Sequence, residues 1–243
     1  MSLAPARAPG AWREAAARGL AAARTNLRAG LVLWVLAGAL VAGFYGSDAV
    51  RAACDWLAEQ RAVLGWWYPI ASTAVFGGLL PLAFQALARG DAPRDPWGRL
   101  PFFLSFWGAK GAELEAWYRL QAWAFGADAS PGVVAVKVAA DQLLYAPLWA
   151  APSMLIAYRW KDTGFDAAAA ARSIDRAWWR VVYVPAMLAN WVLWVPAVTL
   201  IYCLPLPLQL PLQNLVLCFA VLIGALLARG EAVPRAPDSP RVA

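Results

Sequence analysis

Long apolar stretches alternate with short polar segments along most of the chain. A helix needs about 20 residues to cross the hydrocarbon core of a bilayer, and each stretch approaches or exceeds that length. The pattern therefore predicts an all-α fold, a multi-pass transmembrane helical bundle with about six spanning helices. The predicted spans cover residues 29–46, 66–88, 100–126, 132–158, 181–203 and 206–228.

Lys and Arg are distributed unevenly over the segments that flank the predicted spans. Sixteen lie in one set of alternate segments, which includes residues 1–28 and 159–180, and two, Arg51 and Arg61, lie in the other set. Cytoplasmic segments of membrane proteins are enriched in Lys and Arg. This asymmetry requires an even number of spans and predicts that both termini are cytoplasmic.

Composition narrows the possible functions. The chain is 62% hydrophobic and 15% charged, with a net charge of +6, whereas soluble domains carry about 25% charged residues. Orientation across a membrane accounts for the excess of positive charge, so no nucleic-acid partner is expected. Histidine is absent, and Cys54, Cys203 and Cys218 form no CxxC pair. We therefore expect no metal, no cofactor and no enzymatic activity.

The two ends of the chain are polar. Residues 1–28 contain five arginines and a single acid, Glu14. They are interpreted as a basic, partly helical cytoplasmic tail, the alternative being an organellar transit peptide. Residues 229–243 are predicted to be a disordered C-terminal tail.

Ionisable and polar side chains occur where the pattern places hydrocarbon. Each charge at a helix centre costs about 2.5–3.5 kcal/mol on insertion scales, so these side chains are expected to pair, to face protein or to line water. The candidates for a polar path or a packing core are Lys110, Glu113, Glu115, Arg119, Lys137, Asp141, Gln142 and Tyr145.

Helical spacing suggests how these candidates are arranged. Lys110 and Glu113 are spaced i, i+3, and Glu115 and Arg119 are spaced i, i+4, so two ion pairs are predicted on different faces of one helix. In the next span, Lys137, Asp141 and Tyr145 recur every four residues and form one polar stripe. Prolines 147 and 152 follow, and each leaves a backbone carbonyl that needs another partner.

Three interpretations of these charges remain open. They fix the packing of the helices, they line a path for solutes or protons, or they catalyse a reaction. The third is disfavoured, because Glu113 and Glu115 are two residues apart and point to different faces of the helix.

Several motifs resemble those of the small peroxisomal membrane protein family, which includes the Mpv-seventeen type of the mitochondrial inner membrane. The most specific match is to its Lys-x-x-x-Asp-Gln-x-x-x-x-Pro element. The matching positions are Lys137, Asp141, Gln142 and Pro147; Tyr68-Pro69, Thr73, Gly77 and Gln85; Gly111 to Tyr118; and Asn190, Trp194, Pro196 and Pro207. The resemblance covers residues 66–228, so residues 29–65 form an extra N-terminal span and loop.

The sequence departs from the family pattern at several positions. Ala112 and Glu115 replace the usual Pro and His, and Val195 is inserted between Trp194 and Pro196. The resemblance implies that the chain is a divergent member of this family. It further implies a helical bundle without a prosthetic group that acts as a pore or transporter for small solutes. The alternative function is that of a non-transporting membrane scaffold or stress-related membrane component.

The expected partners are the lipid bilayer and small solutes, and both a single bundle and a homo-oligomer are compatible with the sequence. The Ala-, Arg- and Trp-rich composition favours a bacterial inner membrane, with a peroxisomal or mitochondrial inner membrane as the alternative.

Overall fold

The computed structural model describes residues 11–88 and 97–230, and within these ranges it is helical, with no strand. The predicted all-α class is therefore confirmed. Residues 1–10 and 231–243, which hold parts of the two predicted tails, lie outside the described residues. The helices are α1 (Ala11–Gly46), α2 (Asp48–Leu64), α3 (Trp67–Thr73), η1 (Ala74–Leu79), α4 (Leu80–Ala88), η2 (Trp97–Arg99), α5 (Leu100–Phe125), α6 (Pro131–Ala140), η3 (Asp141–Ala150), α7 (Ala151–Asp162), α8 (Ala167–Ser173), α9 (Arg176–Trp178), η4 (Trp179–Tyr183), α10 (Val184–Tyr202) and α11 (Leu206–Gly230).

Consecutive elements join into long rods that follow the predicted spans. Among the described residues, three rods are long and apolar enough to cross a membrane: Trp67–Phe84, Pro131–Asp162 and Arg176–Tyr202. A fourth is reached if Gly30–Gly46 and Asp48–Leu64 count as one broken span. Helix α5 fails the same criterion because it holds four charged residues. A count of six spans therefore remains a prediction.

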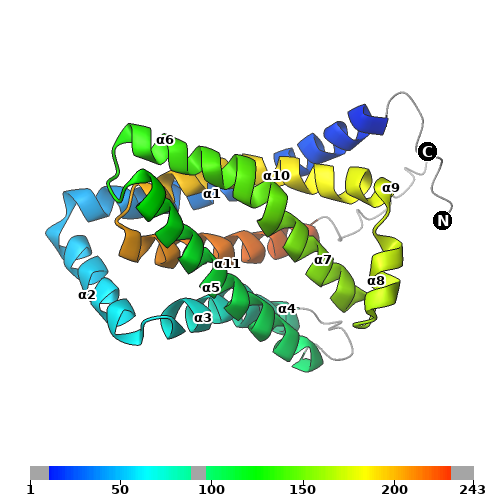
Figure 1. Ribbon diagram of the computed structural model, residues 1–243, viewed down its shortest axis with the longest axis horizontal. Coiled ribbons are helices and arrows are strands. Elements are labelled where there is room, and N and C mark those ends of the chain that lie inside the picture. The colour runs from blue at the N-terminus through cyan, green and yellow to red at the C-terminus, as the bar shows by residue number, and fades with distance from the viewer. Residues whose placement is uncertain (1–10, 89–96, 231–243) are drawn as a thin grey trace, which may run out of the picture.

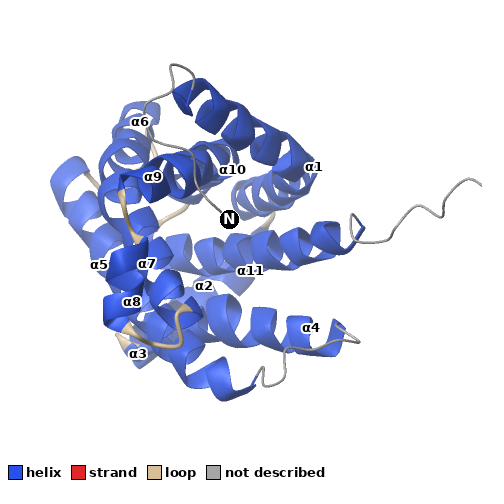
Figure 2. Cartoon of the chain, turned by 90° about the vertical axis from the view of Figure 1, so that its right-hand side faces the viewer, coloured by secondary structure: helices blue, strands red, loops and turns tan. Residues whose placement is uncertain are grey.

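The rods lie side by side around α11. Helix α11 contacts α1, α2, α3, α4, α5 and α10, and it runs through the middle of the bundle when the molecule is viewed end-on (Figure 2). Its buried Leu208, Leu210, Leu212 and Val216 form the core together with Ile201 of α10. Helix α1, which contains the predicted N-terminal span, is not peripheral, because it packs along α10 (Figure 1).

The loop predicted after the first span is instead a helix. The chain turns by 101° at Ser47, and α2 then crosses one end of the bundle (Figure 1). Arg51 stabilises this turn, because its guanidinium donates hydrogen bonds to the carbonyl oxygens of Phe44 (3.2 Å) and Tyr45 (3.1 Å) at the end of α1. These carbonyls would otherwise lack helical partners.

Pro147 lies inside a stretch of π-helix, η3, and Pro152 follows in the first turn of α7. In a π-helix each backbone N–H donates to the carbonyl five residues earlier. Proline has no N–H, so that carbonyl needs another donor. The indole N–H of Trp191 donates to the carbonyl oxygen of Gln142 (2.8 Å), and the hydroxyl of Tyr183 donates to that of Pro147 (2.5 Å). Aromatic side chains of α10 and η4 thus supply the partners that the sequence required.

Candidate functional site

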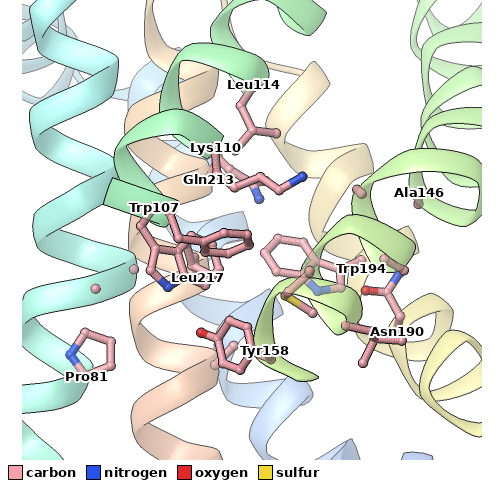
Figure 3. Close-up of a pocket in the computed structure, with 18 of the residues that line it drawn as sticks. Pro81, Trp107, Lys110, Leu114, Ala146, Tyr158, Asn190, Trp194, Gln213 and Leu217 are labelled. Carbon is pink, nitrogen blue, oxygen red and sulfur yellow. The ribbon is translucent and has the colours of Figure 1, made fainter. Parts of the chain in front are cut away.

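A cavity of about 610 Å³ lies inside the bundle, between η1 and α4, α5, η3 and α7, α10 and α11. Figure 3 shows Trp107 and Leu217 on one side, Trp194 and Asn190 on the opposite side, and Lys110 and Gln213 along one edge. Ligand sites are typically concave and mainly apolar, with a few polar groups that orient the ligand. The cavity has this character, and it is the candidate functional site.

Four of the eight predicted residues line this cavity: Lys110, Asp141, Gln142 and Tyr145. The geometry of α5 and η3 explains why they meet. Gly111 lets α5 approach α3 so closely that an added Cβ atom would lie 2.0 Å from the carbonyl oxygen of Pro69. The small residue therefore permits close packing of α5 against α3.

The first polar cluster joins α5 to η3 and α7. The ammonium of Lys110 donates to both carboxylate oxygens of Glu113 (2.8 and 2.9 Å) and to the hydroxyl of Ser153 (2.7 Å). Glu113 also accepts a hydrogen bond from the hydroxyl of Tyr145. The i, i+3 ion pair predicted from the sequence is present, and it draws on all three donors of Lys110.

The second cluster surrounds the carboxylate of Asp141, which is 6% exposed. Its Oδ2 accepts from the indole of Trp117 (3.1 Å) and the hydroxyl of Tyr202 (2.8 Å), and its Oδ1 accepts from the amide of Gln142 (2.8 Å). In all three hydrogen bonds the carboxyl oxygens of Asp141 are the acceptors. Within residues 11–88 and 97–230 no cation pairs with it.

Glu115 belongs to a third cluster, which does not line the cavity. Its buried carboxylate pairs with Arg119 (2.7 Å), as the i, i+4 spacing predicted, and also with Arg61 of α2. Arg61 donates further hydrogen bonds to the carbonyl oxygens of Leu206 (2.9 Å) and Pro207. The carbonyl of Pro207 has no helical donor four residues later, because position 211 is also proline.

The predicted stripe of Lys137, Asp141 and Tyr145 is not a shared path. Lys137 is 1% exposed, does not line the cavity, and holds its ammonium over the ring of Tyr202, 5.8 Å from the centroid. The backbone N–H of Asp141 still donates to the carbonyl oxygen of Lys137, so the two residues keep α-helical spacing and differ in the direction of their side chains.

Sequence reasoning missed several buried polar residues. Arg61 was predicted to lie in the loop after the first span, but it is 6% exposed and connects three helices. Tyr118 donates to Gln213 (3.2 Å), and Thr73 donates to Asn214 (2.9 Å), so α11 is joined to both α5 and α3. The one available signal for α11 was its run of amide residues, Gln209, Gln213 and Asn214, at helical spacing.

No group of three or more potential metal ligands occurs in the described parts of the chain. Comparison with known proteins found no matching family model, no matching curated protein and no matching solved structure.

Proposed function

We propose that this protein is an integral membrane bundle of six spans that carries a small solute through its central cavity. The observation that supports this proposal is the 610 Å³ cavity with buried polar groups on its wall. Its volume falls within the range of about 300–1,000 Å³ that is typical of small-molecule sites. Buried polar groups at membrane depth cost free energy, so their exposure to an internal cavity is consistent with a solute pathway.

The cavity extends from the charged end of the bundle toward its middle. Arg99 and Lys161, at the end where α5 begins and α7 ends, line it together with the deeper Lys110 and Asp141. Beyond Asp141, the buried Tyr118, Tyr202 and Gln121 fill the space between helices. This arrangement fits a carrier or gated pore that is open toward one side.

The proposed membrane is a bacterial inner membrane with both termini in the cytoplasm. The positive-inside distribution of Lys and Arg supports this orientation, and reporter fusions at each terminus test it. Membership of the small peroxisomal membrane protein family, as a divergent branch, is part of the proposal and rests on the motif from Lys137 to Pro147.

Transport is tested with purified protein reconstituted in liposomes. Swelling after an osmotic step would be followed with glycerol and sorbitol, and conductance would be recorded in potassium chloride. Ala146→Trp places a bulky ring in the cavity that Ala146 lines, and Leu148→Trp places the same ring at a position that is 71% exposed and outside the cavity.

We expect flux through the unmodified protein and through Leu148→Trp, and little flux through Ala146→Trp. If the unmodified protein transports none of these solutes or ions, the transport proposal fails. It also fails if Ala146→Trp is folded and transports normally.

A scaffold function is the second candidate, and one observation favours it. The Lys110–Glu113 and Arg61–Glu115–Arg119 clusters satisfy their charges within the bundle, as interhelical packing requires. A scaffold predicts that substitutions in these clusters lower stability while the liposomes show no protein-dependent flux.

A further inference from the structure

Hydrogen-bonding capacity is distributed unevenly around the cavity. Three cations line its wall. Arg99 lies at the end of the bundle where α5 begins. Lys110 bonds to Glu113 and Ser153, and Lys161 bonds to Asp162 and lies over the rings of Phe103 (5.8 Å) and Tyr158 (5.5 Å). Lys110 and Lys161 therefore have few unused hydrogen-bond donors for an anionic ligand deep in the cavity.

Two buried polar atoms on the wall have no hydrogen-bond partner in the part of the chain that the structure describes. One is the indole Nε1 of Trp107, a donor, and the other is Oε1 of Gln142, an acceptor. The Gln142 side chain is 4% exposed and lines the cavity. An unpaired buried acceptor is unfavourable, so a ligand N–H group at Oε1 of Gln142 would supply the hydrogen bond that the protein does not make.

Asp141 adds a second acceptor beside the first. Its Oδ1 accepts one hydrogen bond, from the Gln142 amide, while Oδ2 accepts two. A carboxylate oxygen has two lone pairs, so Oδ1 retains one. Glu113 pairs with Lys110, so Asp141 is the acidic group in the deep part of the cavity that no described cation pairs with.

The remaining wall is rich in aromatic rings. Phe103, Phe106, Trp107, Tyr145, Tyr158 and Trp194 all line the cavity. Aromatic faces attract cations and also pack against flat apolar groups. Trp107 and Trp194 lie on opposite sides of the space (Figure 3).

We infer that the cavity binds an aromatic ammonium ion whose N–H groups donate to Asp141 Oδ1 and Gln142 Oε1 and whose rings pack against the aromatic wall. This assignment names the ligand class of the proposed carrier, and it rests on the proposed function in taking the cavity as the solute-binding space.

The test is calorimetric titration of the full chain in detergent at pH 7 with four probes of matched shape. Dibenzylammonium carries both charge and N–H donors, dibenzyldimethylammonium carries charge alone, dibenzyl ether carries neither, and dibenzyl phosphate is an anion. We expect dibenzylammonium to bind at least tenfold more tightly than the other three, which is the order of one charge-assisted hydrogen bond.

Two substitutions locate the site. Asp141→Asn removes the charge with little change of shape and is expected to weaken dibenzylammonium binding about tenfold to a hundredfold. Gln142→Met removes the acceptor and is expected to weaken binding about fivefold to tenfold. Arg119→Gln, at a side chain that is 57% exposed and outside the cavity, is the matched control and should bind as the unmodified protein does.

Equal binding of dibenzylammonium and dibenzyl ether, tighter binding of dibenzyl phosphate, or unchanged binding by folded Asp141→Asn would each overturn the inference. Binding in detergent requires no flux, so its outcome is separate from that of the liposome assay. Flux of glycerol without ammonium binding would leave the transport proposal standing and remove this assignment alone.

Discussion

Replacing Arg61 with alanine should be among the most destabilising single changes in the protein. The Arg61 guanidinium is buried and bonds to Glu115 and to the carbonyl oxygens of Leu206 and Pro207. Breaking a buried ion pair by removing one partner costs about 3–5 kcal/mol. Glu115 keeps its ion pair with Arg119, which favours the lower part of that range. The Pro207 carbonyl loses a hydrogen-bond donor that its own helix does not replace, and this loss costs about 1–3 kcal/mol more. The expected loss in the free energy of unfolding is therefore about 4–6 kcal/mol.

Arg119→Ala is the matched control, because it removes the other cation bound to the same carboxylate. The Arg119 side chain is 57% exposed, and exposed ion pairs contribute about 0–1 kcal/mol. Arg61→Met combined with Glu115→Gln should be less destabilised than Arg61→Ala, since no unpaired charge remains buried.

The assay is reversible unfolding in mixed micelles, followed by circular dichroism and by Trp fluorescence. If Arg61→Ala and Arg119→Ala lowered stability by similar amounts, the buried role assigned to Arg61 would be wrong. A loss below about 1 kcal/mol for Arg61→Ala would refute the reasoning from burial.

Three further predictions address other parts of the bundle. Trp191→Phe should lower stability by about 1–3 kcal/mol, because the Gln142 carbonyl oxygen loses its donor at 2.8 Å; Trp194→Phe is the control, and equal thermal shifts for the two variants would contradict the assignment. Gly111→Ala should prevent α5 from packing on α3, since its Cβ would lie 2.0 Å from the Pro69 carbonyl oxygen. Gly108→Ala is the control, because its Cβ would meet the side chain of Ile70 at 3.4 Å. The control should give a monodisperse, folded protein on size-exclusion chromatography. Hydrogen bonds from the hydroxyl and backbone N–H of Ser130 hold the pKa of Asp128, in the loop between α5 and α6, below its ordinary value of 3.8, so its contribution to stability is present above that pH and is lost as the pH falls through the lowered pKa. The melting-temperature difference between the unmodified protein and Asp128→Ala should thus be constant from pH 7 to about pH 5 and should shrink below about pH 4, and a difference that grows on acidification would contradict this sign.

The sequence by itself determined the helical class and the approximate course of the rods. Apolar runs of span length favour a helix, because a helix satisfies its own backbone hydrogen bonds. The apolar ranges from residue 66 onward coincide with helical rods to within a few residues, whereas the first, 29–46, is only part of α1, which begins at Ala11. The sequence also determined both ion pairs of α5, Lys110–Glu113 and Glu115–Arg119, because helical geometry brings residues three and four apart together.

Only the tertiary structure decided which polar groups share a site. Arg61 and Glu115 are 54 positions apart, and their pairing depends on the 101° turn that lays α2 across the end of the bundle. Lys137 and Asp141 are four residues apart and nevertheless separate, because one holds its charge over Tyr202 and the other faces the cavity. Side-chain spacing along one helix specifies neighbours on that helix, whereas burial and pairing across helices depend on packing that no single segment encodes.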